Sequence, residues 1–151
     1  MDVDARLKEL KLTLPPPPKP VASYVPLVKS GNLVFVSGVV PHTEGRPLAV
    51  GAAGKETTAD QANAAAKQTA LLALSLLHAN DLLHRIKRVV RVTGYVASTP
   101  TFIDQPKVIN GASDLLLQVF GDAGRHARSA VGVASLPLNS TVEVEFIFEV
   151  A

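Results

Sequence analysis

The residues most suited to chemistry lie near the end of the chain, at Arg128 and Glu143. The planar guanidinium of an arginine can hold a carboxylate through two parallel, charge-assisted hydrogen bonds. A glutamate can hold a water molecule and accept its proton. On residue types alone a structural interpretation is favoured, in which Arg128 pairs with a sheet glutamate and the glutamates form a solvated row. Binding of a small carboxylate is the functional alternative.

Other catalytic side chains are sparse. The chain has no cysteine, which excludes disulfides, thiolate catalysis and cysteine-ligated metals. Ser37 has no histidine that can be placed as its base, so it is not expected to be a nucleophile. No cofactor is expected, because neither a phosphate-binding loop nor a dinucleotide fingerprint occurs. No metal is expected either, because the histidines lack metal-ligand spacing; they are His42, His78, His84 and His126.

A small basic cluster at Arg125, His126 and Arg128 raises phosphate or RNA as a ligand. The chain has no tryptophan and few other aromatic residues that could stack on bases, and its net charge is only +2. Nucleic acid is therefore not expected as a partner.

Length and composition indicate one globular domain. The chain has 151 residues, of which 47% are hydrophobic. No apolar run reaches the roughly 18 residues that a membrane span needs. Three acidic residues in the first ten, Asp2, Asp4 and Glu9, fit neither a secretory nor a transit signal. A cytoplasmic protein without membrane contact is the expectation.

The chain is expected to divide into an N-terminal extension over 1–20 and a single domain over 21–151. The extension has a short helix over 2–12. The proline-rich run over 15–20 is extended polyproline II, because proline fixes φ and lacks a donor. It is interpreted as a stiff strap laid over the fold, with an SH3-type ligand as the alternative.

Two amphipathic helices are predicted within the domain. Thr58 and Gln61 form a capping-box pattern, and the helix that follows runs over 59–79 to a stop at Asn80. A second helix is capped by Asp104 and ends at Gly121.

The remaining patterns predict strands at 21–28, 32–38, 86–97, 128–135 and 142–150, with a possible short strand near 48–50. In the last strand valines and phenylalanines alternate with Glu143, Glu145 and Glu149. The order ββ-α-β-α-ββ predicts an α+β fold, with a mostly antiparallel sheet and two helices on one face. The other face, which also carries Arg91 and Tyr95, is left for solvent or for assembly.

A longer pattern spans the last two strands. Residues 126–137 read His-Ala-Arg-Ser-Ala-Val-Gly-Val-Ala-Ser-Leu-Pro, and residues 142–145 read Val-Glu-Val-Glu. This pattern resembles the signature of the YjgF/RidA family, also called the endoribonuclease L-PSP family. The resemblance covers about residues 21–150. Weaker matches are Tyr24 in the first strand, Ser37-Gly38 at the end of the second, and Asn110 in the second helix.

The resemblance implies a chorismate-mutase-like fold and a homotrimer with ligand clefts between subunits. It also implies hydrolysis of reactive enamines and imines, such as 2-aminoacrylate, to 2-keto acids and ammonia. Arg128 and Glu143 would then be catalytic, and the substrate would be bound by Tyr24, Ser37, Gly38, Asn110 and Ala130. The alternative is a non-catalytic module that binds small carboxylates, RNA or protein, including the ribonuclease role claimed for parts of the family.

The sequence departs from the family pattern at several points. Ala22-Ser23 replaces the Gly-Pro before the tyrosine, and Val39 replaces the glutamine after Ser-Gly. The proline-rich strap and the loop over 41–56 lengthen the chain. These features indicate a longer branch of the family.

Arg128 and Glu143 are not expected to meet through a simple hairpin. Direct pairing of the last two strands would place Arg128 opposite about Glu149, roughly 20 Å from Glu143. Either another strand separates them, or the glutamate comes from a neighbouring subunit.

Overall fold

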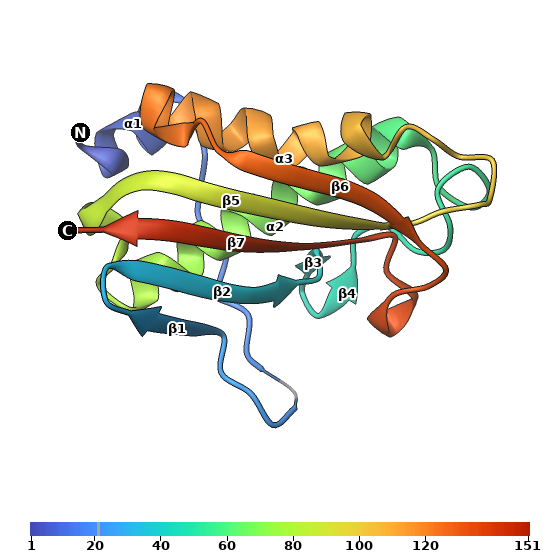
Figure 1. The fold of residues 1–151 in the computed structure, drawn as a ribbon, viewed down its shortest axis with the longest axis horizontal. Helices are drawn as coiled ribbons and strands as arrows, with labels where there is room; N and C mark the ends of the chain where they lie inside the picture. Colours follow the sequence, from blue (N-terminus) through green and yellow to red (C-terminus); the bar gives the residue numbers. More distant parts are fainter. Residues whose placement is uncertain (21) are drawn as a thin grey trace.

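The computed structural model describes residues 1–20 and 22–151. A five-stranded sheet in the order β1-β2-β7-β5-β6 carries two long helices on one face (Figure 1). The helices are α1 (Val3–Glu9), α2 (Ala59–Ala79) and α3 (Gln105–Phe120), and the sheet strands are β1 (Leu27–Ser30), β2 (Leu33–Val39), β5 (Ile86–Ala97), β6 (Ala127–Val133) and β7 (Val142–Val150). Among the described strands of this sheet, β5 and β6 pair in parallel, and the other neighbours pair antiparallel. The predicted α+β fold is confirmed.

The two long helices start and end close to where the sequence predicts. The capping box of α2 is present: the Gln61 amide donates to the Thr58 hydroxyl at 3.1 Å, and the Thr58 amide donates to the Gln61 side chain at 3.0 Å. Asn80 is its C-cap. Asp104 precedes α3 as predicted, but its side chain makes no capping hydrogen bond. Gly121 ends α3 with a φ of 60°, a conformation that glycine adopts without strain.

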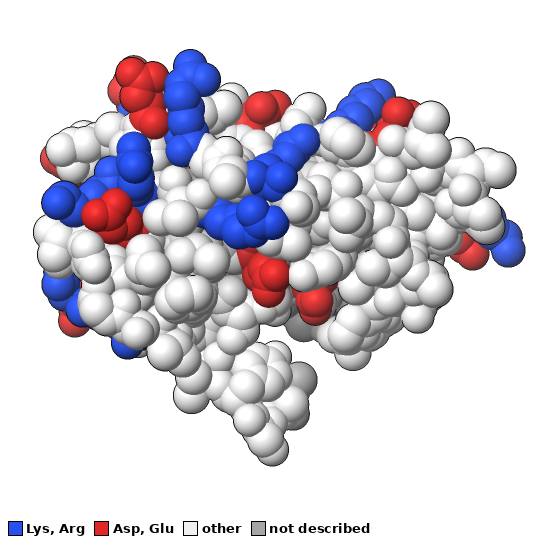
Figure 2. Space-filling model, viewed as in Figure 1, with Lys and Arg blue, Asp and Glu red and all other residues white. Residues whose placement is uncertain are grey.

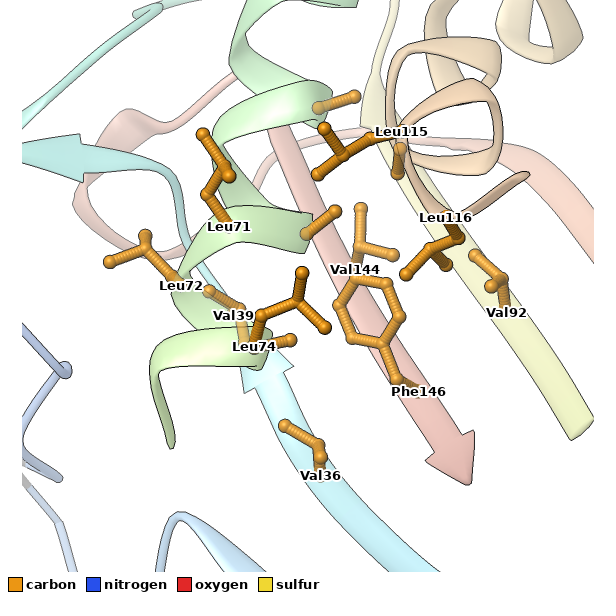
Figure 3. Packing of buried hydrophobic residues seen from close by; sticks show 14 of the residues in the cluster. Val36, Val39, Leu71, Leu72, Leu74, Val92, Leu115, Leu116, Val144 and Phe146 are labelled. Carbon is orange, nitrogen blue, oxygen red and sulfur yellow. The ribbon is translucent and has the colours of Figure 1, made fainter. Parts of the chain in front are cut away.

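The core lies between the helices and the sheet. Figure 3 shows leucines of α2 and α3 meeting valine and phenylalanine side chains of the strands. In β7 the predicted alternation is confirmed, because every second side chain is buried and no more than 1% exposed: Val142, Val144, Phe146, Phe148 and Val150. The pattern arises because successive strand residues point to opposite faces.

The helices α2 and α3 approach each other closely at Gly111. A β-carbon there would lie 2.0 Å from the carbonyl oxygen of Asn63, so the crossing requires glycine. The Asn63 side chain also donates to the Lys107 carbonyl at 2.8 Å. This contact fixes the height of α3 over the sheet, and α3 carries Asn110.

Several local predictions are wrong. The strand predicted over 21–28 begins only at Leu27, and its first residue, Val21, lies outside the described residues. Tyr24 therefore lies in the loop before β1 rather than in a strand. Instead of a strand near 48–50, the chain forms a small hairpin of β3 (His42–Thr43) and β4 (Arg46–Pro47). The alternation expected along β5 is interrupted, because a register shift between Val89 and Arg91 turns both Val89 and Val92 into the core.

The N-terminal segment packs on the rest of the chain. Asp2 caps α1, and Val3 and Leu7 join the core. The proline-rich segment then passes behind the sheet from the side of α1 towards β1 (Figure 1). Ser75 of α2 donates to the carbonyl of Pro15, which attaches the strap to the helix layer. Among the described helices, none has the length and apolar character to cross a membrane.

Candidate functional site

Arg128 lies on the edge strand β6, on the face that the helices cover. It pairs with Val92 of β5, whose side chain is buried in the core. Its Nη1 donates to the Asn110 side chain at 2.7 Å and to the Ser113 hydroxyl at 3.2 Å, and its Nη2 approaches the Pro106 carbonyl at 3.4 Å. Three positions along α3 therefore orient the guanidinium. Within residues 1–20 and 22–151 of this chain, Arg128 forms no salt bridge with a glutamate, and the structure places it in contact with Asn110.

A serine and a histidine extend this hydrogen-bond network. His126 Nδ1 lies 2.7 Å from the Gly124 carbonyl, and its Nε2 lies 2.8 Å from the Ser113 hydroxyl. A carbonyl only accepts, so in the neutral ring Nδ1 donates and Nε2 accepts the Ser113 proton. The Ser113 oxygen is then directed towards Arg128. The role of Ser113 was not predicted from the sequence, because a single serine in a helix does not indicate which side chain it contacts.

The contacts of Arg128 leave donors for a ligand. A guanidinium has five N–H groups, and the three contacts to α3 engage three of them. Within residues 1–20 and 22–151, the other two have no acceptor, which is enough for a two-bond carboxylate contact. Ala130 lies two residues further along the same face of β6 and is partly buried against the core. Asn110, Arg128 and Ala130 are called the arginine half-site below.

The other predicted residues line a cavity of about 420 Å³ near the opposite edge of the sheet. Tyr24, Ser37, Gly38 and Glu143 all contribute to its wall, and they are called the glutamate half-site below. The strap forms another part of the wall through Pro18, Lys19 and Pro20. The irregular pairing of β2 with β7 between Val36 and Val39 occurs at Ser37 and Gly38, as β-bulges often do beside functional sites.

Two contacts shape this cavity. The Ser37 hydroxyl donates to the Val25 carbonyl at 2.7 Å, so it ties down the loop that carries Tyr24. Tyr24 itself is 50% exposed. A β-carbon on Gly38 would lie 3.0 Å from the carboxyl carbon of Glu143, so the glycine leaves the space that the carboxylate occupies.

The carboxylate of Glu143 is poised to take up a proton. Burial raises its pKa above the ordinary value of 4.5, and the nearby negative charge of Glu145 raises the pKa further. Glu145 accepts a hydrogen bond from the Tyr95 hydroxyl at 2.9 Å, which raises the pKa of Tyr95. Arg91, on the same face of the sheet, donates to the Ser129 hydroxyl at 2.9 Å.

The two half-sites are separated within one chain. β5 lies between β6 and β7, so the intervening strand that the sequence analysis considered is present. Along the register, Arg128 aligns with Val92 and then with Phe146, whose side chains face the helices. Glu143 aligns with Tyr95 on the opposite, uncovered face. The two side chains therefore leave the sheet on opposite faces, and no stagger of the strands brings them to one ligand.

The uncovered face of the sheet is mixed in character. Figure 2 shows basic and acidic side chains side by side on this face. Apolar side chains lie among them: Phe35 is 42% exposed and Val131 44% exposed, and the partly buried Ile147 pairs with Phe35. Such a surface is compatible with assembly.

The comparisons with known proteins agree with the fold. Residues 4–150 match the family described as "YjgF/chorismate mutase-like, putative endoribonuclease". The chain belongs to this family. The matched residues include most of the segment over 1–20.

Three relatives are similar over nearly their whole length. Protein TCP17 of Trypanosoma cruzi is 43% identical over 150 residues, which cover 97% of this chain and 93% of the relative. The crystal structure of Atu1372 from Agrobacterium tumefaciens is 44% identical, with a TM-score of 0.90 and coverage of 99% and 92%. A structure from Shewanella oneidensis that carries the same endoribonuclease designation is 34% identical, with a TM-score of 0.92 and coverage of 98% and 99%.

Proposed function

We propose that this protein hydrolyses reactive enamines and imines of small 2-amino acids, of the 2-aminoacrylate type, to 2-keto acids and ammonia. The observation that carries the proposal is the pair of half-sites. One offers a guanidinium with two N–H donors left for a carboxylate. The other offers a carboxylate with a raised pKa, in a cavity large enough for a small molecule.

The reaction requires positioning and one proton relay. The enamine takes a proton at its terminal carbon and becomes the imine. Water then adds to the imine carbon, the resulting carbinolamine expels ammonia, and the 2-keto acid remains. Arg128 binds the substrate carboxylate and draws electron density away from the adjacent carbon. Glu143 accepts the proton of the attacking water and returns it to the departing amine, for which a raised pKa is suited.

Two chains are needed to complete such a site. The arginine half-site lies on β6 at one edge of the sheet, and the glutamate half-site lies towards the opposite edge, past β7 (Figure 1). Two different surfaces of one chain that meet on neighbouring copies form a head-to-tail contact, which gives a closed ring when the rotation between copies closes. We infer a homotrimer in which each cleft takes Arg128 from one subunit and Glu143 from the next.

The test is keto-acid formation from 2-aminoacrylate released in the cuvette by an amino-acid dehydratase. Spontaneous hydrolysis sets the baseline, and the protein is expected to raise the rate of pyruvate formation above it. A rate equal to the baseline with folded protein would overturn the proposal.

Cleavage of RNA is the alternative that the family description raises. His126 is the histidine nearest to Arg128 in sequence, but both of its ring nitrogens are engaged by Gly124 and Ser113. A general base has to reach the hydroxyl that it deprotonates. The same preparation should therefore leave single-stranded RNA intact under conditions in which it deaminates, and the reverse result would favour a nuclease.

A further inference from the structure

The structure assigns a second site to this chain: a binding site for a divalent transition-metal ion, formed by Asp4, His78 and His84. The three residues come from separate segments, namely α1, the last turn of α2, and the 3-10 turn η1 (Leu83–Arg85). They lie apart from both half-sites, so the assignment does not depend on the proposed reaction.

The ligand atoms are already close to metal-binding geometry. One atom from each of the three residues lies within 4.8 Å of the other two. His84 Nε2 lies 3.5 Å from Asp4 Oδ2. Bond lengths of about 2.0–2.2 Å around tetrahedral zinc place ligand atoms roughly 3.3 Å apart. Ligand atoms as far apart as 4.8 Å would have to approach one another by up to about 1.5 Å, through rotation of exposed side chains.

The donor set indicates the class of ion. Two imidazole nitrogens and one carboxylate oxygen suit zinc, nickel, copper or cobalt, whereas calcium and magnesium prefer oxygen ligands alone. The simpler alternative is an exposed ion pair between Asp4 and a protonated His84. That alternative gives no role to His78, whose ring lies edge-on to that of His84 with centroids 6.2 Å apart.

The surroundings of the site leave the ion accessible. All three residues are exposed, and Asp4 and His78 also line an open hollow of about 710 Å³ beneath the strap. Three protein ligands with an open fourth position leave room for water. Because Asp4 lies on α1 and the histidines lie some 74 and 80 residues later, a bound ion would link the N-terminal helix to the end of α2.

The experiment uses the full-length, tag-free protein after treatment with a chelator. Zn²⁺ binding is measured by titration calorimetry, and Co²⁺ is used as a coloured probe of tetrahedral nitrogen and oxygen coordination. We expect one Zn²⁺ per chain, and at least about tenfold weaker binding in each of Asp4→Asn, His78→Ala and His84→Ala. The matched control His42→Ala should bind like the wild type.

Thermal unfolding gives a second readout, because an ion that binds only the folded state raises the Tm. At the same Zn²⁺ concentration the Tm of the wild type and of His42→Ala should rise, and the Tm of the three ligand variants should rise by less. Circular dichroism confirms that the variants fold. Absence of one-to-one binding, or equal affinity in the wild type and the three ligand variants, would overturn the assignment, as would loss of binding in Glu143→Gln alone.

Discussion

Arg128 owes its orientation to neighbours on one helix. Asn110 and Ser113 accept from the same terminal nitrogen, and the Pro106 carbonyl lies near the other. A lysine would bring the same charge but only a single nitrogen, which cannot fill these positions and also hold a carboxylate in a fork. The role of Arg128 is thus geometric as much as electrostatic.

Replacement of Arg128 should therefore damage the reaction without unfolding the protein. We expect Arg128→Ala to lower kcat/KM by about 10–100-fold, because one charged contact contributes roughly 1.5–3 kcal/mol, and Arg128→Lys to fail as well. Arg125→Ala is the matched control, since Arg125 lies nearby but pairs with Asp122. The readout is the pyruvate assay. Wild-type rates in Arg128→Ala would show that the carboxylate binds elsewhere.

In the proposed reaction, Glu143 should make the rate sensitive to pH in a definite direction. A general base has to be unprotonated, so kcat/KM should fall as the pH drops through the pKa of Glu143. Because burial and Glu145 raise this pKa, the fall should begin above the range of an ordinary glutamate, whose pKa is 4.5.

Glu145→Gln removes the negative charge that helps to raise the pKa of Glu143. The substitution should therefore move the midpoint of the pH–rate profile to lower pH. Glu149→Gln, on the same face of β7 but further along the strand, is the control and should leave the midpoint in place. If the midpoint is unchanged in Glu145→Gln, Glu143 is excluded as the titrating base.

At the scale of elements, the helices and β7 could be predicted well because their signals are local. The capping box of α2 and the alternation in β7 are written in neighbouring residues. The register shift that turns Val89 inward could not be predicted, because it depends on how β5 pairs with β7. For the same reason the parallel pairing of β5 and β6 was not predicted.

The candidate site, too, could be predicted where its signal is local and not where it depends on the tertiary fold. The motif was enough to recognise Arg128, Glu143 and the other residues of the two half-sites. That they leave the sheet on opposite faces required the strand order. The grouping of Asp4 with His78 and His84 required the tertiary fold, because the residues are far apart in sequence.

The crossing of α2 and α3 gives a prediction at this scale. Gly111→Ala should lower the free energy of unfolding by about 1–3 kcal/mol, because a β-carbon cannot fit against the Asn63 carbonyl without moving a helix. Urea unfolding measures the change. Asp114→Ala, on the exposed side of α3, should be nearly neutral. If Gly111→Ala is as stable as the wild type, the crossing is looser than described.

At the scale of the whole molecule, the chain presents two incomplete sites and one uncovered sheet face. The helix layer covers only one side of the sheet, and Phe35 and Val131 remain exposed on the other (Figure 1). A ring of identical chains would cover that face and bring each arginine half-site to a neighbour's glutamate half-site. Activity would then depend on assembly.

The most direct test of this shared cleft is complementation between two inactive variants. Arg128→Ala and Glu143→Ala chains are unfolded together, refolded at equal ratio, and checked for mixed assembly by native mass spectrometry. If each cleft draws on two chains, about a quarter of the clefts in random mixtures combine an intact Arg128 with an intact Glu143. We therefore expect activity to recover to about a quarter of the wild-type rate. Verified mixed assemblies that remain as inactive as either parent would contradict the shared cleft.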